Sequence, residues 1–376
     1  MNEEVLKQEK SAITANEKLS LSAKKDTNEP SAQFKPSAQL LEFLKAHNVS
    51  LGFTTYRTGK TVLVGRMPDG ERVSFYQQVF KQSLGLASSN DGQQLALGTA
   101  HQIWRFANAV PLNEGAEHEK VYIPQIGYTT GACHASDLGF DKDGKIVFVN
   151  TLFSCVATVS ETESFVPLWK PPFISSLAPE DRCHLSGLGF RDGEARYVSG
   201  FSQTDTKDGW HEQRQSGGFV MDLKTNEVLC EGLSMPHSPR WYQDKLWVLN
   251  SGEGSFGYVD MSTKQFTAVT LCPGYARGLS FCGNFALIGL SKLRSDAVNK
   301  GLVVEKRLAA EKAESYCALQ IVDLRTAETA LLLLLEKPVE EIRDVIIISN
   351  TRNPMLVGFS SDEIYRYMVF NQELLK

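Results

Sequence analysis

The chain has 376 residues, of which 42% are hydrophobic and 22% charged, and its formal net charge is −5. This composition is typical of a soluble globular protein large enough for one or two domains. The acidic balance argues against a nucleic-acid partner, because non-specific affinity for nucleic acid depends on basic side chains that neutralise phosphates.

The apolar runs of the chain are short. The longest, at 330–335 and 345–348, fall well below the roughly 20 residues that a membrane helix needs. The first residues lack the basic and apolar regions of a secretory signal. We therefore expect a cytoplasmic protein without membrane contact. Seven cysteines without a Cys-x-x-Cys pair favour reduced thiols over a disulfide framework.

Residues 1–35 are rich in Lys, Glu, Ser and Asn and poor in large apolar side chains, which predicts a disordered tail. Residues 36–376 are predicted to form a single domain. It begins with a short helix over Ser37–His47, where a serine cap precedes a cluster of leucine and phenylalanine residues.

From residue 50 onward, short apolar segments alternate with Gly, Asp and Asn turns, a pattern typical of all-β folds. Turns such as Asn90-Asp-Gly92, Asp143-Gly144 and Asp192-Gly193 separate paired segments. Glycine and asparagine tolerate a positive φ, so these turns favour β-hairpins.

The hairpins repeat. Aligned on an apolar pair, the first strands begin at His134, His184, His237, Tyr275 and Glu341, with spacings of 50, 53, 38 and 66 residues. The second strands end in small polar pairs such as Asn150-Thr151 and Asn250-Ser251. The outer hairpins carry a second repeat, with an Asp at a strand end and a Thr in the turn, at 221–225, 259–263 and 322–326.

Two repeats in step predict a β-propeller of four-stranded blades. Counting Leu51-Gly-Phe53 and Leu84-Gly-Leu86 as further first strands gives seven blades, which we favour. These two segments lie only 33 residues apart, so a shared blade, and six blades in total, is the alternative. A charged helical pattern near 295–315 indicates an insertion over one face.

Several long motifs cover the chain from about residue 40 to residue 361. They are Leu97-Gly-Thr-Ala-His-Gln-Ile-Trp104, Val149-Asn-Thr-Leu-Phe-Ser-Cys155, Trp169-Lys-Pro-Pro-Phe-Ile-Ser175, Ala178-Pro-Glu-Asp-Arg-Cys-His-Leu185, Thr204-Asp205 with Gly209-Trp210, and Leu233-Ser-Met-Pro-His-Ser-Pro-Arg-Trp241. In these motifs the chain resembles a family of uncharacterised bacterial conserved hypothetical proteins. The resemblance implies a propeller-like fold and supplies no reaction. Similar members usually have an acidic residue directly after the first histidine, where this chain has Ala135. If that acid is functional in the family, either Asp137 replaces it or the role is lost in this chain.

In a propeller, the start of each innermost strand and the end of the antiparallel second strand lie at the same mouth. Three histidines at strand starts, His134, His184 and His237, would suit Zn²⁺ or another divalent first-row metal. Glu253, Glu341 or Tyr275 could act in catalysis, the carboxylates as general base. The residues expected to bind substrate are Arg182, Arg240, Arg277, His101, Asn150, Asn250, Asp137 and Trp210.

This set predicts a metal-assisted lyase, isomerase or hydrolase that acts on a small anionic molecule, since guanidinium groups pair with carboxylate or phosphate. Histidines that bind substrate without metal, or that only join neighbouring blades, are the alternatives for the three strand starts. A propeller module that binds a protein or peptide partner is the alternative function. No phosphate-binding loop or dinucleotide fingerprint is present, so no nucleotide cofactor is expected.

Overall fold

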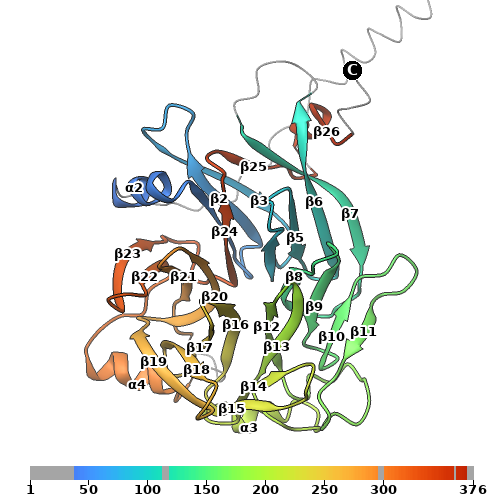
Figure 1. Cartoon of the computed structure of the whole chain (residues 1–376), viewed down its shortest axis with the longest axis vertical. Helices are drawn as coiled ribbons and strands as arrows, with labels where there is room; N and C mark the ends of the chain where they lie inside the picture. The colour runs from blue at the N-terminus through green and yellow to red at the C-terminus, as the bar shows by residue number, and fades with distance from the viewer. Residues whose placement is uncertain (1–37, 112–117, 295–299, 360, 371–376) are drawn as a thin grey trace, which may run out of the picture. The chain divides into compact units, whose positions relative to one another are not determined.

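The computed structural model describes residues 38–111, 118–294, 300–359 and 361–370. The predicted tail over 1–35 lies outside these residues. The strands belong to one compact unit, Gln33–Lys376, and form six sheets arranged in a ring (Figure 1). In the described part of the chain, no helix has the length and apolar character needed to span a bilayer.

Each sheet contains a blade of four antiparallel strands, which are consecutive in the chain in every blade except the one that closes the ring. Four blades run from the innermost to the outermost strand in chain order. They are β8 (Ala135–Phe140), β9 (Ile146–Asn150), β10 (Cys155–Thr158) and β11 (Val166–Trp169); β12 (Leu185–Arg191), β13 (Glu194–Gly200), β14 (Gly218–Asp222) and β15 (Val228–Leu233); β16 (Pro236–Tyr242), β17 (Lys245–Asn250), β18 (Ser255–Asp260) and β19 (Gln265–Leu271); and β20 (Tyr275–Cys282), β21 (Phe285–Ser291), β22 (Ala318–Asp323) and β23 (Glu328–Leu334).

A fifth blade carries extra strands on its outer side. It comprises β4 (Leu86–Ser88), β5 (Gln94–Gly98), β6 (Gln102–Pro111) and β7 (Lys120–Thr129). The short strand β25 (Pro354–Leu356) adds to β7 in parallel, and β26 (Tyr367–Met368) pairs with β6. The segment after the last blade therefore packs along the outside of this one.

The sixth blade joins the two ends of the ring. Strand β24 (Asp344–Ser349) comes from late in the chain and pairs as the innermost strand with β1 (Val49–Thr54), which β2 (Lys60–Arg66) and β3 (Val73–Val79) follow. The propeller therefore has six blades, and the preference for seven was wrong. The segment Leu51-Gly-Phe53, counted as a first strand, lies in the second strand of a blade that β24 completes.

Three α-helices and one short 3-10 helix (Asp362–Tyr365) accompany the sheets in the described residues. The predicted N-terminal helix is α2 (Ala38–His47), whose Phe43 packs edge-on against Phe285 at 5.4 Å between ring centroids. Helix α3 (Trp210–Gln213) lies between β13 and β14, and α4 (Val303–Ala310) lies in the predicted insertion between β21 and β22. The segments of α3 and α4 meet where Arg214 donates to the Lys300 carbonyl.

The hydrophobic core lies between neighbouring blades. Val149 of one blade clusters with Leu188 and Phe219 of the next, and Trp247 clusters in the same way with Leu279 and Ile288. The innermost strands of successive blades contact one another all round the ring. Strands buried on both faces explain why their sequences are apolar runs interrupted by small residues.

Hydroxyl groups join each of four blades to the next. A Thr or Ser at the end of the second strand donates to the carbonyl that opens the next innermost strand: Thr54 to Leu84 at 2.5 Å, Thr151 to Leu185 at 2.8 Å, Ser251 to Ala276 at 2.6 Å and Ser291 to Ile342 at 3.1 Å. The small polar residues seen at second-strand ends are thus inter-blade contacts. These carbonyls also define equivalent positions around the channel.

Two rings of side chains follow from this equivalence. Ala135 pairs with Asn150, and Pro236 pairs with Asn250 in the same way. Ala135 and Pro236 therefore occupy equivalent positions at the start of their innermost strands. We call the residues just before these positions the outer ring: Ser83, His134, His184, Met235, Tyr275 and Glu341. The residues just after them form the inner ring: Gly85, Ser136, Ser186, His237, Arg277 and Arg343. His134, His184 and Met235 share the same left-handed backbone, with φ of 50°, 47° and 48°.

Candidate functional site

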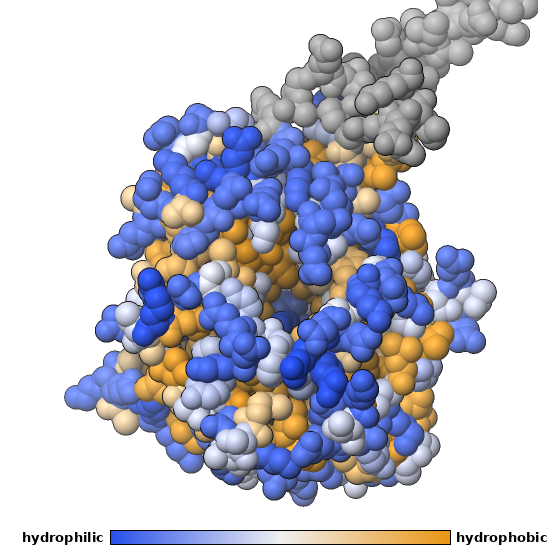
Figure 2. Space-filling model, in the orientation of Figure 1, coloured by the Kyte–Doolittle hydropathy of each residue, from blue (hydrophilic) through white to orange (hydrophobic). Residues whose placement is uncertain are grey.

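A cavity of about 180 Å³ opens at the mouth of the channel. We call it the mouth cavity. Its described lining residues come from the strand starts and loops of all six blades: Tyr56, Leu84, His134, Ser136, Thr151, His184, Phe201, Trp210, Met235, Arg277, Arg294 and Arg343. Figure 2 shows the ring face-on, with a hollow at its centre that contains hydrophilic side chains. The cavity is small beside the roughly 300–1,000 Å³ of sites for drug-sized ligands.

Three guanidinium groups face this cavity. Arg277 and Arg343 occupy neighbouring inner-ring positions, and neither forms an ion pair with another described residue. Arg343 donates one hydrogen bond, to the Ser136 hydroxyl at 2.9 Å. Burial, and then the like charge of Arg277, lower the pKa of Arg343. Arg294 forms an ion pair with Glu341. An anion in the cavity would relieve the repulsion between Arg277 and Arg343.

His184 lies in the mouth cavity with its ring fixed on two sides. Its Nδ1 lies 2.7 Å from the Asp181 carboxylate. The rings of Phe201 and Trp210 pack against it at centroid distances of 4.3 and 4.4 Å. A carboxylate on one ring nitrogen orients an imidazole and stabilises its protonated form, which is the arrangement of a general acid–base pair.

His134 lines the same cavity from the neighbouring blade. Its side chain is exposed. Partial desolvation lowers the pKa of His134, the Asp181 carboxylate opposes that shift, and Arg343 and His184 add to it. Both histidines are therefore close to one another and to the arginines.

His237 does not occupy the position that the repeat predicted. It belongs to the inner ring, and Met235 stands where His134 and His184 stand. The alignment assumed that Trp241 matches Leu138 and Leu188. Pro236 is equivalent to Ala135, so Pro239 is equivalent to Leu138, and the β16–β17 register shifts between His237 and Arg240. The predicted alignment of this strand was therefore displaced by two residues, from Met235 to His237.

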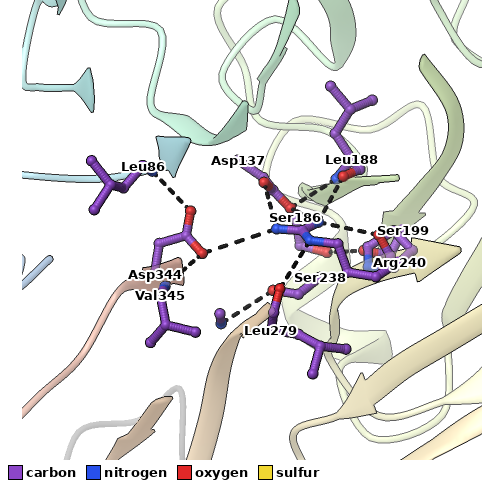
Figure 3. Close-up of polar contacts among 12 residues, drawn as sticks. Leu86, Asp137, Ser186, Leu188, Ser199, Ser238, Arg240, Leu279, Asp344 and Val345 are labelled. Carbon is purple, nitrogen blue, oxygen red and sulfur yellow. Dashed lines mark hydrogen bonds and ion pairs between the residues drawn. The ribbon is translucent and has the colours of Figure 1, made fainter. Parts of the chain in front are cut away.

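Arg240 and Asp137, both predicted to bind substrate, bind each other inside the channel (Figure 3). The guanidinium forms two bonds of 2.8 and 3.0 Å with the Asp137 carboxylate, and it also donates to the carbonyls of Leu188 and Leu279. Asp344 lies 4.0 Å from it. We call Asp137, Arg240 and Asp344 the channel triad.

The channel triad also holds the neighbouring strands. Asp137 accepts from the Leu188 amide at 3.0 Å and Asp344 from the Leu86 amide at 2.8 Å. Ser238, at the equivalent position of a third blade, accepts from the Gly278 amide at 3.1 Å. The acceptors therefore come from alternate blades and the amides from the blades between them, so that the triad joins all six.

The other predicted substrate-binding residues make structural contacts. Asn150 and Asn250 are buried, and their side-chain oxygens accept from the Phe153 and Ser234 amides. Arg182 pairs with Glu180 and Asp205 and so fastens two surface loops to each other. His101 is exposed in the turn between β5 and β6 and is not among the lining residues of the mouth cavity.

None of the three predicted catalytic residues is among the described lining residues of the mouth cavity, although Tyr275 and Glu341 belong to the outer ring. Tyr275 is buried in the outer ring; burial raises its pKa and the nearby Arg277 opposes that shift. Glu341 is buried, accepts from the Arg57 amide at 2.7 Å and pairs with Arg294. Glu253, half-buried in the turn after β17, has a pKa raised by burial and does not line the cavity. Trp210, predicted to bind substrate, lines the mouth cavity from α3.

Four residues of the site were not identified from the sequence: Tyr56, Asp181, Arg294 and Arg343. Asp181 stands three residues before His184 within a quoted motif, and Arg343 stands two residues after Glu341 in the aligned strand start. Their spacing from the repeated positions is a signal that could have indicated them. Tyr56 and Arg294 lie in loops outside the repeat, where no such signal exists.

The described residues of the mouth cavity do not form a complete set of metal ligands. Across residues 38–111, 118–294, 300–359 and 361–370, no three His, Cys, Asp or Glu side chains are arranged to hold a metal. His134 and His184 share the cavity with guanidinium groups, which repel a divalent cation. We therefore derive no step through a metal ion, and the metal stays a prediction.

Comparison with known proteins extends this description. No curated protein matches the chain. A nidogen/laminin complex structure superposes with a TM-score of 0.53 at 11% identity, over 81% of this chain and 99% of the matched one. A protein of unknown function from Bacteroides caccae (TM-score 0.48, 10% identity, 80% and 98% covered) and a streptogramin B lyase (0.40, 10%, 70% and 78%) are more distant. At these identities the first likeness shows the fold alone. The family model described as "Domain of unknown function (DUF4915)" matches residues 38–357, and the chain belongs to that family.

Proposed function

We propose that the protein binds a small anionic molecule in the mouth cavity and acts on it as a lyase, isomerase or hydrolase, with His184 as general acid or base. The observation that carries this proposal is that two arginines without a carboxylate partner lie next to a histidine–carboxylate pair in the cavity. Arg277 and Arg343 are held side by side without a carboxylate partner in the described part of the chain, next to the His184–Asp181 pair.

The electrostatics support an anion as the ligand. Guanidinium groups bind carboxylate and phosphate through paired hydrogen bonds. The Nε atoms of Arg277 and Arg343 are buried and have no hydrogen-bond partner among the described residues. Buried donors are normally satisfied. An oxyanion would supply the missing acceptor for each.

Calorimetry with inorganic phosphate, malate and citrate tests the binding step. We expect binding by the wild type and a loss of affinity of about tenfold or more in Arg277→Ala and Arg343→Ala, since each removes a charge-assisted contact. Arg325→Ala is the matched control, because Arg325 is exposed and pairs only locally with Asp323. Absence of binding by the wild type, or an equal loss in the control, would contradict the proposal.

A compound screen followed by NMR separates an enzyme from a binding module. For a compound that binds, the wild type should convert it, and His184→Ala should bind it without converting it. Asp181→Asn should reduce turnover more than affinity, because it changes the partner of the imidazole and leaves the arginines in place. Binding without conversion of any screened compound would favour the alternative of a non-catalytic module.

A metal ion held by His134 and His184 would change this chemistry. Metal analysis of protein purified without a histidine tag tests it. Stoichiometric zinc that is lost in a folded His134→Ala, His184→Ala variant would support a metal-assisted reaction, whereas equal metal content in both would contradict it.

A further inference from the structure

His237 is a buried histidine whose tautomer the structure determines. It is 3% exposed, and its Nδ1 lies 3.0 Å from the Met235 carbonyl and 3.1 Å from the Ser251 hydroxyl oxygen. A carbonyl can only accept. The Ser251 hydroxyl gives its own proton to the Ala276 carbonyl at 2.6 Å. Both neighbours therefore need a donor, so Nδ1 carries the proton and Nε2 is left with its lone pair.

The Nε2 atom is a buried acceptor without a donor. It has no hydrogen-bond partner among the described residues, whereas buried polar atoms in proteins are nearly always paired. Burial, followed by the charges of Arg277 and Arg343, holds the pKa of His237 well below its usual value. The ring is therefore neutral, and Nε2 needs a hydrogen-bond donor from elsewhere.

The position of His237 relates this acceptor to the mouth cavity. Its inner-ring equivalents Ser136, Arg277 and Arg343 all line the cavity. Two further lining residues touch the imidazole: Phe201 packs edge-on against it at 5.2 Å between centroids, and Met235 accepts from Nδ1. The imidazole of His237 thus packs against two residues of the cavity wall and lies near Arg277 and Arg343.

We infer that His237 Nε2 accepts a hydrogen bond from a hydroxyl group of the anion bound at the mouth, so that the ligand is a small hydroxylated carboxylate or phosphate. This inference rests on the proposed function, which supplies the anion. A hydroxyl is favoured over an ammonium group, because Arg277, Arg294 and Arg343 would repel a second cation at the same place. His237 is accordingly assigned as the residue that determines specificity for the hydroxyl group.

Matched ligand pairs test the inference by calorimetry: malate against succinate, and glycerol 3-phosphate against propyl phosphate. We expect the wild type to bind the hydroxylated member at least about tenfold more tightly, because a ligand without the hydroxyl group leaves the buried His237 Nε2 acceptor unpaired. His237→Phe keeps a ring and removes the acceptor, so the preference should disappear. Arg343→Ala, the control, should weaken both members and keep the preference.

Equal affinity of the wild type for both members would overturn the inference, as would an equal loss for both members in His237→Phe. If that variant does not fold, ¹⁵N NMR of the wild type decides: the His237 Nε2 resonance should shift with malate and stay unchanged with succinate. Identical spectra with the two ligands would overturn the inference. Anion binding without hydroxyl preference contradicts this inference alone, whereas no anion binding contradicts the proposed function as well.

Discussion

Arginines occur both inside the channel and at its mouth, and the charges next to them differ: Arg240 lies beside a carboxylate, whereas Arg343 lies near another arginine. In the channel triad, Arg240 spreads its hydrogen bonds over the Asp137 carboxylate and three carbonyl groups. Burial would lower the pKa of Arg240, but the Asp137 carboxylate outweighs it and the pKa is raised. At the mouth, burial and Arg277 lower the pKa of Arg343. The deep arginine pairs with a carboxylate, whereas the Nε atoms of the shallow pair have no hydrogen-bond partner among the described residues.

This difference separates a structural arginine from a ligand-binding one. All of these residues stand on or next to innermost strands, so the sequence pattern makes them look alike. What distinguishes them is whether a carboxylate of another blade faces them, and that depends on the closure of the ring. The variants below test this comparison.

Arg240→Ala should have the largest effect. It leaves Asp137 buried without its counter-ion, and breaking a buried pair by removing one partner costs roughly 3–5 kcal/mol of unfolding free energy. Urea unfolding measures it, with Arg277→Ala as the matched control on the neighbouring innermost strand. An equal loss in the two variants would remove the distinction between the channel triad and the mouth.

Asp344→Asn should change how stability depends on pH. Burial, and then the negative charge of Asp137, raise the pKa of Asp344 to about 7 from its usual value of 3.8. Between about pH 4 and pH 7 the folded protein holds a proton that the unfolded chain releases, so the contribution of this group to stability falls as the pH rises.

The asparagine variant should lack that decline and gain roughly 2 kcal/mol relative to wild type between pH 5 and pH 8. Urea unfolding at pH 5, 6, 7 and 8 measures the difference between the two proteins. A stability difference between the two proteins that does not vary with pH would contradict the raised pKa of Asp344.

Arg343→Ala should leave stability nearly unchanged, because the substitution removes the repulsion of Arg277 together with a single hydrogen bond to Ser136. Its effect should appear as a loss of anion affinity of about tenfold, or about 1.4 kcal/mol. Thermal unfolding with and without inorganic phosphate records both quantities. A large loss of stability without phosphate would show that Arg343 is structural, like Arg240.

Thr151→Val should have the smallest effect. It removes the hydroxyl that joins β9 to the Leu185 carbonyl and keeps the side-chain shape, at a cost of about 1 kcal/mol. Thr267→Val on the exposed face of β19 is the control. Equal stability of the two variants would show that the inter-blade hydroxyls contribute little to the ring.

The local features of the blades were predictable because they depend on neighbouring residues. The Asp–Thr repeat forms as expected: Asp222 Oδ1 accepts from the Lys224 and Thr225 amides, and Asp260 Oδ1 from the Ser262 and Thr263 amides. The hairpin glycines Gly92, Gly144 and Gly193 have φ of 64°, 74° and 73°. Such turns are encoded within four or five residues.

The site was predicted less completely, because it is formed by contacts distant in the sequence. His134, His184 and Arg277, which the repeat assigned to one mouth, line one cavity, and Trp210 lines it from a segment outside the repeat. The repeat also suggested that Asp137 and Arg240 bind substrate, although they lie 103 positions apart in the chain and bind each other. The carboxylate that pairs with an arginine across the ring belongs to a strand distant in the sequence, so the local sequence pattern cannot indicate it.

The sequence alone determined the propeller, its hairpins and the strand starts around the channel, since hydrophobic periodicity and turn chemistry are local properties. Tertiary structure decided the rest. Pairing of β24 with β1 set the number of blades at six, the pairing of Pro236 with Asn250 placed His237 in the inner ring, and ring closure determined which arginines meet a carboxylate. These outcomes depend on non-local strand pairing, in which one shifted residue or one distant strand changes what each side chain faces.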